Sequence, residues 1–232
     1  MSRFASIVFT PRVKAEQARV GSRRAYARID GAGPLDALGD GEQEFLAARD
    51  SFYMASVGET GWPYIQHRGG PRGFVKVLDA HTIGFADYRG NKQYISLGNI
   101  ASEDRVALIL VDYPNRARLK ILARVQVVTR ESDQEMFGRV AGDVRAERVY
   151  VLRLEGFDWN CPQYVTPRFT EDEVREMVRP LVEKLEALKG EVARRNGVKQ
   201  ATFSQSPLIS RYRSRRSAHG SPASRLRSRG DC

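Results

Sequence analysis

The middle of the chain, from about residue 50 to about residue 157, alternates short apolar runs with turn signals. Such runs, closed by turns such as Glu59-Thr60-Gly61 and Asp79-Ala80-His81, are typical of an antiparallel sheet or barrel. Helical patterns interrupt them at about 91–99 and 131–141, where a barrel needs a crossover or a cap. The pattern predicts an α+β fold, mainly β, with strands at about 52–58, 63–68, 73–79, 82–87, 105–113, 118–129 and 147–157.

The segments around this sheet differ from it in composition. Residues 1–40 are mixed, contain several Gly and Pro residues, and are expected to form an N-terminal arm that wraps on another element. A short helix is expected at 41–50, where the barrel domain of residues 41–168 begins. No internal repeat is visible.

Residues 169–197 have the pattern of an amphipathic helix. Thr170-Glu171-Asp172-Glu173 matches a capping box. Apolar residues then recur at spacings of three and four, and this stripe is expected to cover the barrel or a second subunit. Pro180 lies inside the pattern and predicts a kink or a restart, because proline removes a backbone hydrogen bond.

Residues 198–232 form a basic tail rich in Arg and Ser, for which we predict disorder because it has little apolar surface to bury. Of the net charge of +10, this tail carries +7: Lys199 and seven arginines against Asp231. The remaining +3 says little about the ligand of the folded part. A nucleic-acid-binding arm is therefore the weaker alternative, and a solvated basic tail is favoured.

Several function classes are disfavoured by the sequence. The longest apolar run, Val106–Val111, is strand-sized and too short for a membrane span. The first residues lack the pattern of a secretory signal, so we expect a cytoplasmic protein. Two cysteines and three scattered histidines show no metal-ligand spacing, so no metal site is expected.

Cations gather between residues 61 and 92. Arg68, Arg72 and Lys76 lie on two expected strands, and a loop then offers further polar groups at the start of a helix. Cations, a side-chain amide and free N–H groups at a helix N-terminus together form an anion site, which a phosphate would suit. The loop groups are Arg89, Asn91 and Lys92.

Three residues in this part of the chain allow more than one interpretation. Lys76 sits in an apolar strand, so it either points to solvent at a sheet edge or pairs with an anionic ligand. For His67, an ordinary hydrogen bond is favoured over an acid–base role. The segment Trp159-Asn160-Cys161-Pro162-Gln163-Tyr164 is either a turn packed by Trp159 or a group that approaches a cofactor or dimer seam.

Four segments between residues 41 and 165 form a recognisable series: Asp50-Ser51-Phe52-Tyr53-Met54-Ala55-Ser56-Val57, Gly73-Phe74-Val75-Lys76-Val77-Leu78-Asp79, the loop Asp87-Tyr88-Arg89-Gly90-Asn91-Lys92 and Arg118-Leu119-Lys120-Ile121-Leu122-Ala123-Arg124-Val125. In their order and spacing they resemble the pyridoxamine 5′-phosphate oxidase-like family. This resemblance implies an FMN-binding split β-barrel, antiparallel and Greek-key-like, with peripheral helices.

The resemblance also implies site residues. Lys92, Arg89 and Asn91, in the loop from Asp87, would hold the flavin phosphate, with Arg72 or Arg68 as a further charge partner. The isoalloxazine ring would meet Gln66, His67, the backbone of Val75, Lys76 and Val77, and Arg118. The Arg-Leu-x-Pro ending by which true pyridoxamine 5′-phosphate oxidases grip the vitamin phosphate is missing, so vitamin B6 oxidation is not implied.

The implied function is that of an FMN-dependent oxidoreductase acting on an unidentified small-molecule substrate or electron donor. The resemblance implies a homodimer with the flavin near the subunit interface. A non-catalytic flavin or haem carrier or sensor, and a deazaflavin-using protein, stay open as alternatives, because the same barrel serves all of them.

Overall fold

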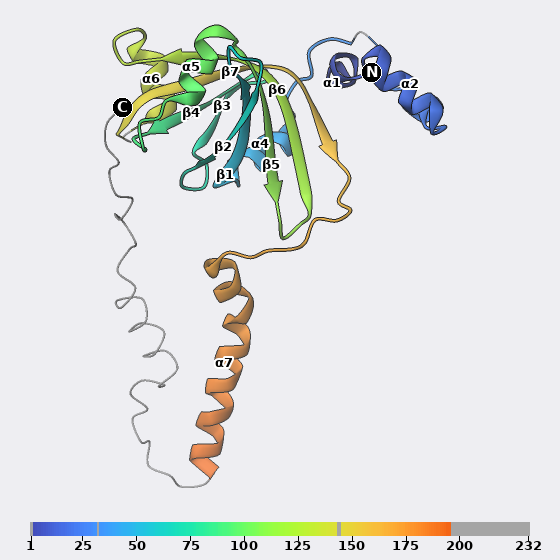
Figure 1. The fold of residues 1–232 in the computed structure, drawn as a ribbon. Helices are drawn as coiled ribbons and strands as arrows, with labels where there is room; N and C mark the ends of the chain where they lie inside the picture. Colours follow the sequence, from blue (N-terminus) through green and yellow to red (C-terminus); the bar gives the residue numbers. More distant parts are fainter. Residues whose placement is uncertain (1, 32, 143–144, 196–232) are drawn as a thin grey trace, which may run out of the picture. The chain divides into compact units, whose positions relative to one another are not determined.

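One antiparallel sheet of seven strands organises the first part of the chain (Figure 1). The computed structural model describes residues 2–31, 33–142 and 145–195. The order of the strands in the sheet is β2-β1-β5-β6-β7-β4-β3. The strands are β1 (Ser51–Val57), β2 (Pro63–Gly69), β3 (Val75–Asp79), β4 (Thr82–Tyr88), β5 (Arg105–Asp112), β6 (Ala117–Val128) and β7 (Ala146–Asn160).

The topology is that of a Greek key. Strands β5, β6 and β7 follow one another as antiparallel neighbours, whereas β4 pairs with β7 and not with β5. Helix α5 (Ile95–Ser102) lies in the connection from β4 to β5. The predicted α+β fold dominated by an antiparallel sheet is therefore confirmed, with each of the seven strands near its expected position.

The main core lies on the concave side of the curved sheet. Alternate residues of β1, β5 and β6 are buried there, as the period of two along a strand requires. Its largest fully buried side chains include Phe52, Phe85 and Tyr150, and Phe85 stacks on Tyr150 with ring centroids 5.1 Å apart.

A second, smaller core lies between the sheet and helix α6 (Gln134–Ala141). Phe137 and Val140 of the helix pack with Val149 of β7. Asp133 caps the helix, since its carboxylate accepts a hydrogen bond of 2.9 Å from the backbone N–H of Met136. Strand β7 is thus covered on both faces near its start.

Helix α5 begins later than the sequence pattern predicts. The expected range was 91–99, but the helix runs from Ile95 to Ser102. Lys92 and Tyr94 have φ angles of 61° and 52°, in the left-handed region, which a right-handed helix cannot include. The residues before Ile95 therefore form a loop that turns sharply, and this loop helps to build the pocket described below.

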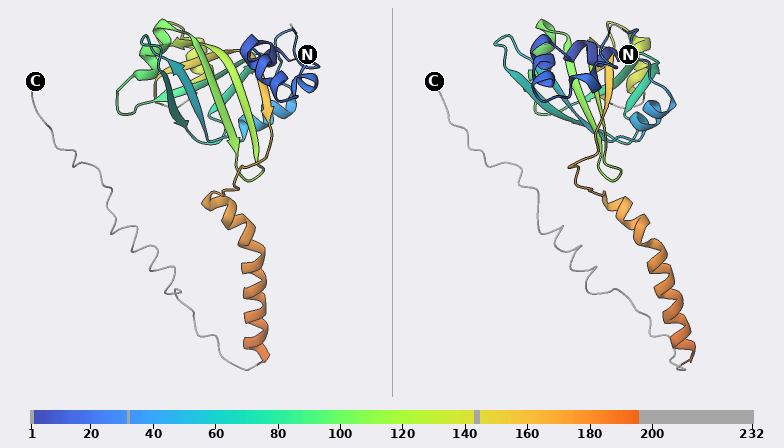
Figure 2. Two further views of the ribbon diagram at one scale, coloured as in Figure 1. Left: turned by 45° about the vertical axis from the view of Figure 1, so that its right-hand side comes forward. Right: turned by 90° about the vertical axis from the view of Figure 1, so that its right-hand side faces the viewer.

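The N-terminal arm contains three helices that the sequence analysis did not assign: α1 (Arg3–Val8), α2 (Pro11–Arg19) and α3 (Arg23–Tyr26). Helix α1 packs on β7, as Figure 2 shows. The carboxylate of Asp36 links them, because it accepts hydrogen bonds from the backbone N–H groups of Arg3, Phe4 and Phe157. Helix α4 (Asp40–Ala47) then leads into β1.

The chain divides into two units, and the second begins at Thr170. In the second unit, helix α7 (Glu171–Arg195) begins with the predicted capping box: Glu173 N–H donates to Thr170 Oγ1 at 3.3 Å, and Thr170 N–H donates to the Glu173 carboxylate at 2.8 Å. The helix continues through Pro180 without ending. The predicted disordered tail, 198–232, lies outside the described residues. Among the described helices, none has the length and apolarity that a bilayer span requires.

Candidate functional site

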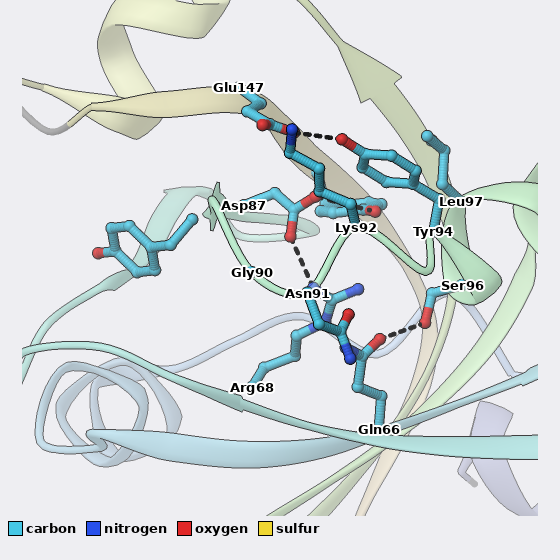
Figure 3. Close-up of a pocket in the computed structure, with 12 residues that line it drawn as sticks. Gln66, Arg68, Asp87, Gly90, Asn91, Lys92, Tyr94, Ser96, Leu97 and Glu147 are labelled. Atoms are coloured by element: carbon cyan, nitrogen blue, oxygen red, sulfur yellow. Dashed lines mark hydrogen bonds and ion pairs between the residues drawn. The ribbon is translucent and has the colours of Figure 1, made fainter. Parts of the chain in front are cut away.

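A small pocket lies where β2, β4 and β7 meet the loop that precedes α5 (Figure 3). Its cavity has a volume of about 60 Å³. Ligand pockets for whole cofactors measure roughly 300–1,000 Å³, so this pocket suits one small polar group of a larger ligand. It is lined by Gln66, Arg68, Asp87, Tyr88, Gly90, Asn91, Lys92, Tyr94, Ser96, Leu97, Glu147 and Tyr150.

The carboxylate of Asp87 is the centre of the charge network in the pocket. Arg68 Nη1 donates to Asp87 Oδ1 at 2.6 Å, and Arg148 Nη1 donates to Oδ2 at 3.1 Å. The hydroxyl of Tyr150 donates to the same Oδ2 at 3.4 Å. The antiparallel register pairs Asp87 of β4 with Arg148 of β7, so sheet geometry brings these charges together.

Arg68 is held rigidly at the base of this network. Its side chain is only 13% exposed, and its guanidinium lies over the ring of Tyr150 at 5.2 Å from the ring centroid. Its Nε is buried and has no hydrogen-bond partner among the described residues. An unsatisfied buried donor is costly, and because this Nε is closed off from solvent, a ligand acceptor would reach it only if the Arg68 side chain shifted.

Tyr94 and Glu147 line the far side of the pocket, and Arg148 pairs with Glu147 from outside the lining. Arg148 Nη2 donates to Glu147 Oε2 at 2.9 Å, and the hydroxyl of Tyr94 donates to the same oxygen at 3.3 Å. Burial alone would lower the pKa of Arg148, but the hydrogen bond with Tyr94 and the nearby Asp87 charge raise it above its usual value. Arg148 therefore stays a cation.

Tyr150 stays protonated for a related reason. Burial raises the pKa of its phenol, and the charge of Asp87 adds to this effect. The hydroxyl group is therefore available as a donor and not as a base near neutral pH.

The loop before α5 carries polar groups to the mouth of the pocket. Asn91 Oδ1 accepts a hydrogen bond from the backbone N–H of Gln93 at 3.2 Å, which fixes the turn. Lys92 lines the pocket, and its side chain runs toward Glu147 in Figure 3. In the first turn of α5, the hydroxyl of Ser96 donates to Gln66 Oε1 at 2.8 Å.

The pocket as a whole favours an anion. Two cations, Arg68 and Lys92, and two carboxylates, Asp87 and Glu147, line it. Arg148, which is not among the lining residues, pairs with both carboxylates and adds a third cation to the cluster. The first turn of α5, which begins at Ile95, also lines the pocket with Ser96 and Leu97. The size of the cavity and the excess of donors match a phosphate group.

Of the twelve residues predicted for the site, five line this pocket together. They come from β2, from β4 and from the loop before α5. They are Gln66, Arg68, Asp87, Asn91 and Lys92.

The other seven predicted residues lie elsewhere in the chain. Arg89 is exposed on the same loop, and Arg72 is exposed in the turn between β2 and β3. His67 lies on the outer face of β2, where its ring meets that of Tyr53 edge-on at 5.4 Å. On β3, Lys76 is exposed, whereas Val75 is buried and Val77 half-buried in the core.

Lys76 is exposed on β3, the last strand of the sheet, so its side chain is open to solvent or to a ligand. Arg118 pairs with Asn160 at the opposite end of β7 from the pocket. Its guanidinium donates to the backbone carbonyls of Cys161 and Gln163. Within one chain it fixes the segment that follows β7.

In the segment 159–164, the side chain of Trp159 packs against residues of α4. Trp159 still belongs to β7, its Nε1 donates to Glu42 Oε1 at 2.7 Å, and its ring meets Phe45 edge-on at 4.8 Å. Cys161 is exposed. Within the described residues, no three His, Cys, Asp or Glu side chains are grouped so that they could hold a metal ion.

Sequence reasoning missed Tyr94, Glu147, Arg148 and Tyr150. The last three lie about sixty residues beyond Asp87 and reach the pocket only through the pairing of β4 with β7. Arg148 and Tyr150 are two residues apart on an expected strand and therefore share one face, and this spacing was the one available signal.

Residues 38–156, which are 119 of the 232 residues, match the family model described as pyridoxamine 5′-phosphate oxidase. The chain therefore belongs to this family. Its seven-stranded antiparallel sheet with peripheral helices is the split β-barrel fold of the family. A search of curated proteins gave no match.

Solved structures with a similar fold share little sequence with this chain. A candidate pyridoxamine 5′-phosphate oxidase from Lactobacillus delbrueckii is 22% identical, with 53% of this chain and 94% of that chain covered and a TM-score of 0.43. HupZ from Group A Streptococcus is 14% identical (57% and 100% covered, TM-score 0.44). HutZ, the haem storage protein from Vibrio cholerae, is 16% identical (53% and 94% covered, TM-score 0.37).

Proposed function

We propose that this chain is an FMN-binding flavoprotein that acts as an oxidoreductase on an unidentified small molecule. The observation that carries the proposal is the small polar pocket that Arg68 and Lys92 line together with the first turn of α5. Membership in the pyridoxamine 5′-phosphate oxidase family supports it. When bound, FMN would supply hydride or single-electron transfer chemistry.

In this proposal the phosphate is held at the pocket by three kinds of donor. Lys92 provides a mobile ammonium, Arg68 provides a fixed guanidinium, and the first turn of α5 provides backbone N–H groups near Ser96. Asp87 and Arg148 hold Arg68 in place. The phosphate contacts supply affinity and register, and leave the redox chemistry to groups around the ring.

The ring of the flavin cannot enter a cavity of about 60 Å³ and must lie on the adjoining surface. A flavin needs most of its surface covered to bind well. A second copy of the chain would provide that cover, so we propose a homodimer. Whether His67, Lys76 or Arg118 meets the ring in such a dimer stays a prediction.

An exposed apolar patch on the outer face of β1 and β2 supports the dimer. Ile65 is 65% exposed and Tyr53 42%, and Trp62, in the turn before β2, is 79% exposed. Ile65 pairs with Ala55 across the strands and Tyr53 lies two residues before Ala55, so Ile65 and Tyr53 share one face. Large contiguous apolar patches on a folded domain are typical of interfaces.

The test is to release and identify the small molecule that co-purifies with the full chain. The expected result is FMN, one molecule per chain, identified by mass and by its absorbance spectrum after denaturation. Haem or a deazaflavin bound at the same stoichiometry would replace the proposal with one of the alternatives. A chain that retains no FMN after incubation with excess FMN and gel filtration would refute it.

A further inference from the structure

Helix α7 carries an apolar stripe with the heptad spacing of a coiled coil. Along the stripe, the intervals between apolar residues alternate four, three, four, three and four. An average spacing of 3.5 residues keeps a seam facing one partner helix in a left-handed supercoil. The d positions are Val174, Leu181 and Leu188, and the a positions are Val178, Leu185 and Val192.

We propose that α7 pairs with α7 of a second copy of this chain as a parallel two-stranded coiled coil. Two of the three a positions, Val178 and Val192, are β-branched, and two of the three d positions, Leu181 and Leu188, are leucine. This choice of residues favours parallel dimers over trimers or tetramers. The inference does not depend on the proposed flavin.

The stripe offers enough area for a specific interface. Its exposed fractions run from 42% at Val178 to 68% at Leu181. Burying one Val or Leu side chain removes roughly 60–120 Å² of apolar surface. Eight half-exposed side chains from each of two helices, the a and d residues with Met177 and Val182, would bury on the order of 750 Å² of apolar surface.

This area is sufficient for a stable dimer contact. Apolar atoms make up about 60% of an interface, so the total would be about 1,250 Å². Specific protein–protein interfaces start at roughly 1,200 Å². No other element is described between residues 170 and 195, so within this unit the stripe has no other described element to pack on.

Outside the apolar seam, charged side chains of α7 pair within the helix itself. Arg179 pairs with Glu176 at 2.9 Å on the outward face, and Lys189, beside the seam, pairs with Glu186 at 2.9 Å. Pro180 occupies a c position, away from the seam, and the helix is continuous through it. When a helix curves around its partner, its backbone hydrogen bonds on the solvent side lengthen. Pro180 lacks the N–H for one such bond on that side, which agrees with the supercoil.

The positions beside the seam make the orientation testable. In a parallel pair, a g residue faces the e residue five positions later on the partner helix. Met177 would then extend the seam with the partner's Val182, whereas Lys184 would face the partner's Lys189. The first contact is apolar and favourable, and the second is a like-charge contact that a single substitution can reverse.

Disulfide cross-linking in the full chain tests the proposal. Cys161 and Cys232 are replaced by serine, and one cysteine is introduced either at an a position (Leu185→Cys) or, as a matched control, at an outward f position (Glu183→Cys). Identical a residues face each other in a parallel pair. Under mild oxidation, Leu185→Cys should form linked dimers at least ten times faster than Glu183→Cys.

Other occupants of the stripe give different results. If the stripe packs on the barrel or on the C-terminal tail, Leu185→Cys links no faster than the control, and the proposal fails. If the helices pair antiparallel, Leu185 meets the partner's Leu181. A mixture of Leu181→Cys and Leu185→Cys chains would then link while neither variant links alone, and this result would overturn the parallel arrangement.

A charge reversal provides a second, independent measurement. Lys189→Glu should speed the cross-linking of Leu185→Cys by about two- to five-fold at low salt, because it faces the partner's Lys184, and the gain should vanish at high salt. Adding Lys184→Glu should return the rate to its original value. An unchanged rate in the single variant would contradict the parallel pairing. FMN content, measured on the same samples, reports on the flavin proposal separately.

Discussion

Replacing Lys92 with Gln should weaken FMN binding much more than replacing Arg89 with Gln. Both residues lie on the exposed loop between β4 and α5, and both changes remove one positive charge. Lys92 lines the phosphate-sized pocket, whereas Arg89 is not among its lining residues. The two variants therefore share their effect on net charge and differ in direct contact with the proposed phosphate.

The expected magnitudes follow from this difference. A hydrogen bond to a charged group contributes about 1.5–3 kcal/mol, which is roughly 10- to 150-fold in affinity. A cation about 10 Å away in water interacts with a dianion by only about 0.8 kcal/mol, and salt screening reduces this to about 0.3 kcal/mol, less than two-fold. Lys92→Gln should thus raise the Kd for FMN at least ten-fold, and Arg89→Gln by no more than about two-fold.

Riboflavin, which lacks the phosphate, provides the decisive comparison. Quenching of flavin fluorescence gives the Kd of both flavins for the wild type and the two variants. For riboflavin, neither variant should differ from the wild type by more than about two-fold. Equal losses of FMN affinity in both variants, or a loss of riboflavin affinity in Lys92→Gln, would refute the assignment of the pocket to the phosphate.

Four further predictions concern other parts of the first unit. Ile65→Lys, on the outer face of β2, should yield a chain that light scattering finds monomeric and that retains little FMN; a flavin-loaded dimer would contradict the proposed interface. Asp158→Asn should raise Tm at neutral pH, because burial raises the pKa of Asp158 and its charged form therefore destabilises the fold. This destabilisation is absent below about pH 4 and sets in as the pH rises through the raised pKa. An equal gain in Tm at about pH 3 would exclude this cause. Gly156→Ala should destabilise by about 1–3 kcal/mol in denaturant titrations, because its Cβ would lie 2.6 Å from a backbone nitrogen of α1. Gly98→Ala, in an open helix position, should instead stabilise slightly, by about 0.5–1 kcal/mol.

The sheet could be predicted from the sequence because its signals are local. Along β5, for example, every second residue packs into the core. These residues are Val106, Leu108 and Leu110, which the sequence shows as apolar residues at a spacing of two. The helices of the N-terminal arm could not be predicted so readily. Helix α2 has no buried residue, and α1 and α3 are only six and four residues long, so no apolar stripe marks them.

The start of α5 illustrates a second limit. A helical pattern extends back to residue 91, but the positive φ angles at Lys92 and Tyr94 end it. Neither residue type prefers that conformation. It goes together with a contact that is distant in sequence, since the hydroxyl of Tyr94 donates to Glu147, fifty-three residues away.

Half of the candidate site was likewise predictable, and the other half depended on strand pairing. The cations near Arg68 and the loop near Lys92 are close in sequence, so their clustering indicated an anion site directly. Arg148 and Tyr150 join them through the register of β4 with β7. No local pattern specifies which strand a given strand pairs with, because the Greek-key connection brings β4 beside β7 across an intervening hairpin.

Asp87 is the residue whose role changes most once this pairing is known. From the sequence it is a member of the loop expected to meet the phosphate, although a carboxylate would repel one. In the structure it accepts bonds from Arg68 Nη1, Arg148 Nη1 and Tyr150, and so it orients donors on two strands. A guanidinium has five N–H donors, and the bond from Arg68 to Asp87 leaves the Nε of Arg68 buried and unpartnered among the described residues. Asp87 therefore acts as a positioning residue: its charge fixes Arg68, and the donors that remain give the pocket its preference for an anion.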